Sequence, residues 1–166
     1  MTSSATRPSI LMWSFASAGI FFTRALLFST WLSRGPEVQQ ALSLNTAQMG
    51  LFVMLFPLGG LAGVLFANTL TVRFGPKVVG SVIYFMGALA LAILGVSIVA
   101  ENLFVSALAL FAMGLPMAIA DFLGNFEGTA VDRLSQKSVF PAIQAAFGVG
   151  MLLGAGGASL AIGAGW

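Results

Sequence analysis

Five long apolar segments constrain the fold of this chain more than any other feature. They lie at about residues 9–33, 47–72, 78–100, 103–130 and 139–165, and the charged residues gather mainly between them. A helix needs about 20 mostly apolar residues to cross a bilayer, and these segments are too long and alternate too weakly to be barrel strands. The sequence therefore predicts an all-α integral membrane protein: a polytopic bundle of about five transmembrane helices forming a single domain over residues 1–166.

Composition excludes several other classes of protein. Only 7% of the residues are charged and 58% are hydrophobic, whereas roughly a quarter are charged in an ordinary soluble domain. The chain has neither Cys nor His, which excludes disulfides, thiolate or histidine zinc sites and histidine-based triads. It also has no phosphate-binding Gly-rich loop and no basic stripe with interleaved aromatic residues. We therefore expect the lipid bilayer as its main surrounding, and no enzyme activity, cofactor, metal or nucleic acid.

Basic residues in the short connecting segments predict the orientation in the membrane. Arg34 would lie alone on the outer side if the N-terminus is cytoplasmic, and five basic residues would lie inside. Cytoplasmic loops carry an excess of Lys and Arg, so we predict a cytoplasmic N-terminus and, after five spans, a C-terminus on the outer side. The five inner residues are Arg7, Arg73, Lys77, Arg133 and Lys137.

The segment between the second and third spans resembles a known loop motif. Residues 68–77 read N-T-L-T-V-R-F-G-P-K, similar to the motif G-x-L-a-D-R-x-G-R-K of the major facilitator superfamily (MFS) at the same place. Leu70, Arg73, Gly75 and Lys77 match it. Asn68 replaces the first Gly, Val72 the Asp and Pro76 the first basic residue of the closing pair. The missing Asp puts the usual Asp-mediated cytoplasmic gate in doubt. A second loop, from Arg133 to Lys137, has a similar pattern. The general excess of basic residues in cytoplasmic loops would also place Arg and Lys in both loops.

The wider pattern resembles the bacterial sugar-permease-like branch of the same superfamily. It covers residues 31–36 and 44–50 around the second span, and residues 125–132 and 141–150 around the fourth and fifth. The resemblance implies an N-terminal MFS half truncated to about five helices. In a complete transporter of this kind, two six-helix halves enclose the solute near the bilayer midplane.

Three hypotheses about function follow from this resemblance. The first is a half-transporter in the bacterial inner membrane for a sugar or other small polar solute, working by secondary transport only with a partner half or as an oligomer. The second is a non-transporting accessory subunit of a larger respiratory, photosynthetic or translocation complex. The third is a degenerate fragment that folds poorly alone.

Arg24 is the most informative single residue, because it lies well inside the first span. A charge at the centre of a transmembrane helix costs at least about 2.5–3.5 kcal/mol, so such residues usually face a protein interior or cavity. Arg24 is therefore a candidate for binding substrate or a carboxylate. The alternatives are snorkelling to the outer interface, or a contact with a carbonyl group or another subunit.

The fourth span carries the acidic candidates near its cytoplasmic end. Asp121 and Asn125 are one turn apart and share a helix face, so both are candidates for a proton or substrate site. Asp121 could instead hold an interior, hydrogen-bonded structural position. Glu127 is expected to anchor a loop by facing Arg73, Lys77 or Arg133. A transporter would bring Arg24, Asp121 and Asn125 to one polar cavity.

Pairs of glycines four residues apart predict close helix packing. The fifth segment holds one such pair and further glycines, so we expect a protein partner or second copy against its exposed backbone. Its glycines are Gly148, Gly150, Gly154, Gly156 and Gly157. The three pairs are Gly59 and Gly63, Gly124 and Gly128, and Gly150 and Gly154.

Overall fold

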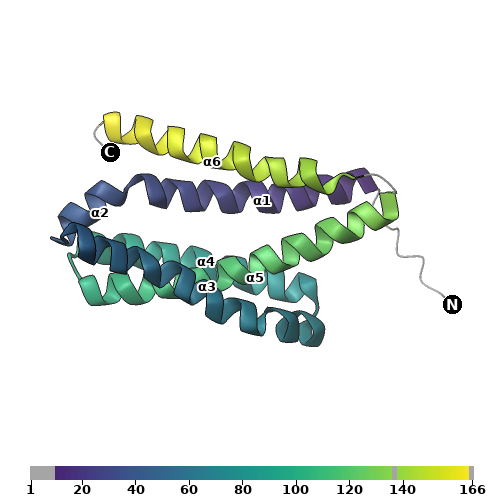
Figure 1. The fold of residues 1–166 in the computed structure, drawn as a ribbon, viewed down its shortest axis with the longest axis horizontal. Helices are drawn as coiled ribbons and strands as arrows, with labels where there is room; N and C mark the ends of the chain where they lie inside the picture. The colour runs from purple at the N-terminus through teal and green to yellow at the C-terminus, as the bar shows by residue number, and fades with distance from the viewer. Residues whose placement is uncertain (1–9, 136–137, 165–166) are drawn as a thin grey trace. The chain divides into compact units, whose positions relative to one another are not determined.

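The computed structural model describes residues 10–135 and 138–164, which form helices joined by short turns. Figure 1 shows their course along the chain. Every helix except α2 is long and apolar enough to cross a membrane. The prediction of an all-α polytopic protein with about five spans is confirmed. The helices are α1 (Ile10–Ser33), α2 (Gly35–Ala41), α3 (Thr46–Phe74), α4 (Pro76–Val99), α5 (Leu103–Ser135) and α6 (Phe140–Gly163).

Two features of these helices differ from the expected segments. The short helix α2 follows α1 directly, with Pro36 in its first turn. The other difference is that α5 continues to Ser135, past the apolar residues that end near position 130. Loss of hydrophobicity ends a membrane span but need not end a helix, and buried Val131 anchors this last part of α5. The orientation in the membrane stays a prediction, and Arg7 and Lys137 lie outside the described residues.

Short capping motifs set several helix ends. Asn45 and Gln48 form a reciprocal capping box at the start of α3, which satisfies two backbone N–H groups. After α4, Glu101 has a φ of 53°, and the backbone N–H groups of Glu101 and Asn102 donate to Ile98 and Ser97. These are the hydrogen bonds of a Schellman motif, which turns the chain sharply. Asn102 then accepts a hydrogen bond from the N–H of Val105 and so begins α5.

The chain divides into two compact units. The first comprises residues 1–30 and 124–166, and the second comprises residues 31–123. The boundary therefore falls inside both α1 and α5. The first unit holds most of α1, the last part of α5 and the whole of α6. The second unit holds the end of α1, the first part of α5, and α2, α3 and α4.

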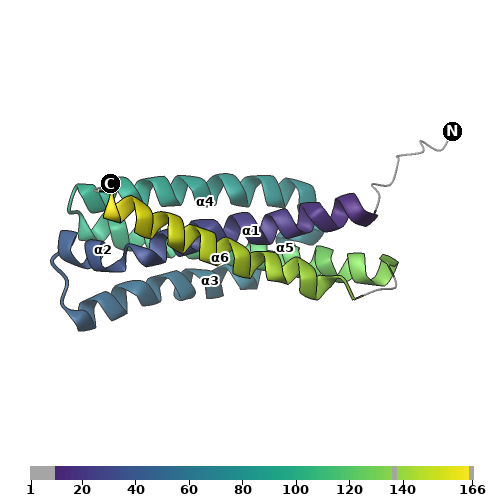
Figure 2. The ribbon, with the colours of Figure 1, turned by 90° about the horizontal axis from the view of Figure 1, so that it is seen from above.

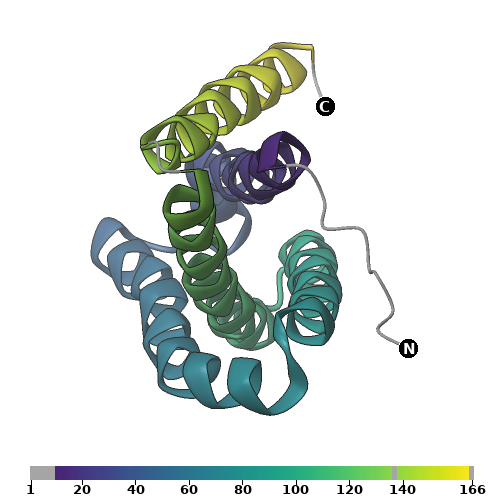
Figure 3. The ribbon, with the colours of Figure 1, turned by 90° about the vertical axis from the view of Figure 1, so that its right-hand side faces the viewer.

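Glycines bring α3 and α5 into close contact within the second unit. In Figure 3 the first part of α5 lies between α3 and α4. A Cβ atom added at Gly59 or Gly63 would overlap the carbonyl group of Phe111 or Leu115, and one added at Gly114 would overlap that of Phe56. Only glycine leaves room for backbones at this separation.

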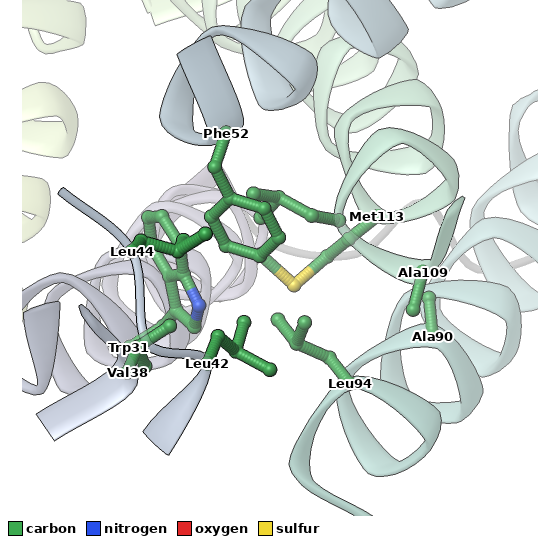
Figure 4. Packing of buried hydrophobic residues seen from close by; sticks show 10 residues of the cluster. Trp31, Val38, Leu42, Leu44, Phe52, Ala90, Leu94, Ala109 and Met113 are labelled. Carbon is green, nitrogen blue, oxygen red and sulfur yellow. The ribbon is translucent and has the colours of Figure 1, made fainter. Parts of the chain in front are cut away.

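A hydrophobic core cluster in the second unit brings together residues of α1, α2, α3, α4 and α5 (Figure 4). Trp31 at the end of α1 stacks on Phe56 of α3, with ring centroids 6.4 Å apart. The short helix α2 lies where α3 begins and α4 ends (Figure 2), and its Val38 belongs to the same cluster. Nearby, the buried hydroxyl groups of Ser97 on α4 and Ser106 on α5 are hydrogen-bonded at 2.8 Å.

In the first unit, α6 lies alongside α1 (Figures 1 and 3). A Cβ atom at Gly150 would meet the backbone of Phe22 and the methyl group of Ala25. One at Gly154 would overlap the hydroxyl of Ser29. The glycines of α6 therefore allow the same kind of close packing as those of α3.

Candidate functional site

Arg24 is buried in the first unit, although it carries a positive charge. Its side chain is only 6% exposed. The guanidinium carbon lies 5.1 Å from the ring centroid of Phe21 on α1 and 5.1 Å from that of Phe147 on α6. Both contacts are cation–π interactions, each of which contributes about 0.5–2 kcal/mol. Two rings from different helices therefore offset part of the cost of burying this charge.

The direction of the Arg24 side chain places its charge near the middle of α1. Its Cα lies about 21 Å from the start of α1 and about 14 Å from its end, at 1.5 Å per residue. Helical side chains point back toward the N-terminus, and Phe21 lies one turn in that direction. The guanidinium therefore sits beside the middle of α1 and not toward its nearer end at Ser33. This direction argues against snorkelling to the outer interface.

The two phenylalanines belong to a larger aromatic contact. Phe21 also meets Phe140 edge-on, with centroids 6.2 Å apart and planes at 66°. On α5, Gly124 lies against the ring of Phe21 and Gly128 against the ring of Phe140. A side chain at either glycine would displace a ring, so these two glycines indirectly help to hold the ring beside Arg24.

The two polar candidates on α5 differ from Arg24 in burial. Asp121 and Asn125 are both exposed on α5. Asn125 lies in the first unit with Arg24, whereas Asp121 belongs to the second. A common cavity for Arg24, Asp121 and Asn125 stays a prediction.

Glu127 has a hydrogen-bond partner that the sequence did not suggest. The indole N–H of Trp13 donates to its carboxylate at 2.8 Å, and this contact ties the beginning of α1 to the last part of α5. Arg133, one of the expected partners of Glu127, is exposed. The expected pairing with Arg73, Lys77 or Arg133 stays a prediction.

The described part of the chain offers no group of three or more acidic, His or Cys residues that could hold a metal. Its polar functional groups are a buried guanidinium, hydroxyls, amides and a few carboxylates. These groups can bind and orient a polar solute or exchange a proton.

Comparison with known proteins found two curated relatives. The chain is 27% identical, over 139 residues or 84% of its length, to an uncharacterised MFS-type transporter from Yersinia pestis. It is 28% identical, over 149 residues or 90% of its length, to an uncharacterised transporter from Sinorhizobium fredii. The chain is similar to MFS-type transporters.

The matched parts make up 35% and 38% of these two relatives. The chain thus spans little more than a third of the length of the curated relatives that it matches. No protein-family model matches the sequence, and no solved structure gives a significant match. Both relatives are named as transporters, one of them of MFS type, and the chain shares with such membrane proteins several helices long and apolar enough to cross a bilayer.

In this MFS-like chain, the residues of the loop motif lie where α3 meets α4. Gly75 separates the two helices and has a φ of 80°. Residues that carry a side chain rarely adopt this backbone conformation. Arg73 and Lys77 flank it and are exposed, and the Arg73 guanidinium lies 5.4 Å from the ring centroid of Phe74. The backbone conformation at this turn therefore explains why a glycine occupies this position of the motif, and both matching basic residues are exposed.

Asp132 has a structural role that the sequence did not indicate. One of its carboxylate oxygens accepts hydrogen bonds from the backbone N–H groups of both Val139 and Phe140, each at 2.7 Å. The first N–H groups of a helix lack partners within the helix, and Val139 has no side-chain cap. Asp132 thus caps α6 from seven residues away. Val139, which occupies the N-cap position of α6, cannot cap the helix with its apolar side chain.

Replacing Asp132 by Asn is expected to weaken this cap. The amide keeps an acceptor oxygen but loses the charge, so the first turn of α6 should lose about 1 kcal/mol of stability. The measurement is hydrogen exchange at the amides of Val139 and Phe140 in lipid nanodiscs. Exposed Glu101 supplies the matched control, Glu101→Gln. Equal protection of the two amides in both variants would contradict the capping role.

Proposed function

We propose that this chain forms part of an MFS-like secondary transporter, corresponding to the N-terminal half, in a bacterial inner membrane. Its solute is a sugar or another small polar molecule. Further spans, from a partner half or a second copy, complete the transport path. The similarity to MFS-type transporters over most of the chain supports this proposal.

The structural observation that carries the proposal is the buried charge of Arg24. A cation beside the middle of a membrane-crossing helix is costly. Two aromatic rings contact this cation, and Gly124 and Gly128 leave room for the ring of Phe21 and for the ring of Phe140 packed against it. A purely structural helix contact needs no charge. A solute path has a use for one, because polar solutes need polar groups in the membrane interior.

The partner surface that we propose is the uncovered side of α6. We expected all five glycines of this segment to be available, but Gly150 and Gly154 are covered by α1 within the chain. Gly148, Gly156 and Gly157 have no atoms within 4 Å of an added Cβ among the described residues. Gly148 and Gly156 lie about two turns apart on neighbouring faces of α6 and would allow close approach of another helix there.

Uptake into proteoliposomes tests the proposed function. Purified chain is reconstituted alone and with any proteins that co-purify with it, a pH gradient is imposed, and a defined mixture of sugars, organic acids and amino acids is added outside. Mass spectrometry of the lumen should show at least one solute enriched over protein-free liposomes. Arg24→Gln should reduce this uptake about tenfold or more, the effect of losing one good charged contact, whereas Arg34→Gln should not.

A different result would favour the accessory-subunit hypothesis. In that result the chain forms a stable complex with other membrane subunits, the complex is unchanged in Arg24→Gln, and no solute is enriched in the proteoliposomes. That combination would contradict a transport role.

A further inference from the structure

An apolar groove runs between α4 and α5 in the second unit. Its volume is about 260 Å³, and its lining consists of apolar side chains from Met86 to Ile93 on α4 and from Val105 to Ala112 on α5. The hollow exists because buried Ala90 and Ala109 face it with small side chains, whereas the larger side chains around them are partly exposed. Figure 4 shows these two alanines close together at the edge of the core cluster.

The depth of this α4–α5 groove matches one leaflet of a bilayer. Val105 lies in the first turn of α5, and Ala112 lies about 10 Å further along the helix, at 1.5 Å per residue. Half of the hydrocarbon core is about 15 Å thick. The groove therefore begins near one membrane surface and ends close to the middle of the bilayer, the depth range of a lipid tail.

The size of the groove also favours a lipid tail over another helix. It has room for about nine methylene groups, each about the size of a water molecule at some 30 Å³. A helix with its side chains is about 10 Å across and would contact α4 and α5 along a whole span. One acyl chain fits the groove in both length and thickness.

The turn at the surface end of the groove carries a single charge. Glu101 is the only charged residue between Lys77 and Asp121 in the sequence, and its side chain is exposed. A lipid whose tail lies in the groove brings its headgroup to this turn. The carboxylate attracts a headgroup that carries a cation and repels one with a net negative charge.

The residue after Glu101 offers hydrogen-bond donors for a phosphate group. The side-chain oxygen of Asn102 accepts a hydrogen bond from the N–H of Val105, so its amide NH₂ group is directed away from that bond, and the side chain is exposed. The N-terminus of a long helix such as α5 favours phosphate as well. Groups for a phosphate and for a cation therefore lie on adjacent residues.

We propose that the α4–α5 groove holds one acyl chain of a phospholipid whose headgroup carries a primary ammonium, as in phosphatidylethanolamine. The ammonium donates hydrogen bonds to the Glu101 carboxylate, and the phosphate accepts them from Asn102. A quaternary ammonium has no N–H to donate, and a charge-assisted hydrogen bond is stronger than a neutral one. This lipid site does not depend on the proposed transport function.

Native mass spectrometry of the full chain in mild detergent tests the headgroup preference. Phosphatidylethanolamine, phosphatidylcholine and phosphatidylglycerol with identical acyl chains are added separately at equal concentrations. Phosphatidylethanolamine should be retained most strongly. In Glu101→Gln its apparent affinity should fall about fivefold, the contribution of one exposed ion pair, whereas the retention of the other two lipids should not fall.

Filling the groove tests the position of the acyl chain. Ala112→Leu places a larger side chain at the deep end of the groove and should reduce the retention of phosphatidylethanolamine about threefold or more, because packing contacts hold the chain there. Ala88→Leu is the matched control, because Ala88 is exposed on α4 and does not line the groove. It should leave retention unchanged.

A second measurement needs no variant and therefore holds even if Ala112→Leu does not fold. Phosphatidylethanolamine with a photoreactive diazirine on its acyl chain is crosslinked to the unchanged chain in nanodiscs. The labelled residues should cluster at 86–93 and 105–112, and an excess of unlabelled phosphatidylethanolamine should compete with the labelling.

Three results would overturn the inference. The first is equal retention of the three lipids, and the second is a headgroup preference that is unchanged in Glu101→Gln. The third is crosslinking spread evenly over the exposed helix faces. Loss of an associated protein, and not of lipid, in Ala112→Leu would also overturn it, because the groove would then hold a helix of a partner.

Discussion

Adding one methyl group at Gly59 is expected to destabilise the chain by about 1–3 kcal/mol or more. In Gly59→Ala the new Cβ would overlap the carbonyl group of Phe111 on α5, and backbone atoms cannot move aside as a flexible side chain can. The helices α3 and α5 must separate, and the contacts at Gly63 and Gly114 would loosen with them. The measurement is the unfolding temperature in mild detergent, monitored by fluorescence-detected size-exclusion chromatography of heated samples.

Gly50→Ala is the matched control, because Gly50 lies on the same helix and an added Cβ meets nothing within 4 Å. In a helix, Ala is more favourable than Gly by about 1 kcal/mol. The same substitution should therefore raise the unfolding temperature at Gly50 and lower it at Gly59. Equal shifts at both positions would show that α3 and α5 do not pack closely at Gly59.

Gly154→Leu is expected to have a similarly large effect in the first unit. Its Cβ would overlap the Ser29 hydroxyl and approach the backbone of Leu26, so α6 should detach from α1. Overpacking of this kind costs about 1–3 kcal/mol, and occasionally more. We expect a low yield of folded protein and a lower unfolding temperature.

Gly156→Leu separates this packing effect from association with a partner. An added Cβ at Gly156 meets nothing within 4 Å, and Leu favours a helix more than Gly does, so the variant should not lower the unfolding temperature and should raise it slightly. If the uncovered side of α6 binds another helix, Gly156→Leu should lose the associated species in native mass spectrometry. Unchanged association would show that the partner binds elsewhere, and an unchanged unfolding temperature in Gly154→Leu would contradict the contact with α1.

The candidate site was only partly predictable from the sequence. The lengths of the apolar segments located Arg24 inside a span, because a charge within some 20 apolar residues must lie in the membrane. They could not show which way its side chain turns. That depends on Phe147, which is far away along the chain and reaches Arg24 only because α6 packs on α1.

The partners of the acidic residues were beyond the reach of sequence for the same reason. Glu127 looked like a partner for nearby basic loops, but it accepts a hydrogen bond from Trp13, 114 positions away. Asp132 lies beyond the expected end of the fourth span near residue 130, but helical continuation of α5 carries it to the first N–H groups of α6. Residue type states what a side chain can bind, whereas the partner depends on which helices meet.

Sequence alone determined the helical class and the number of candidate spans, because backbone groups in lipid must be satisfied within each segment and hydrophobic length measures a span. It also determined that glycines four residues apart would permit close packing. Only the tertiary structure decided which glycines are used within the chain: Gly59 and Gly63 against α5, and Gly150 and Gly154 against α1, leaving Gly156 uncovered. The reason is that glycine spacing is a property of one helix, whereas a close contact needs a second helix at the right height and angle.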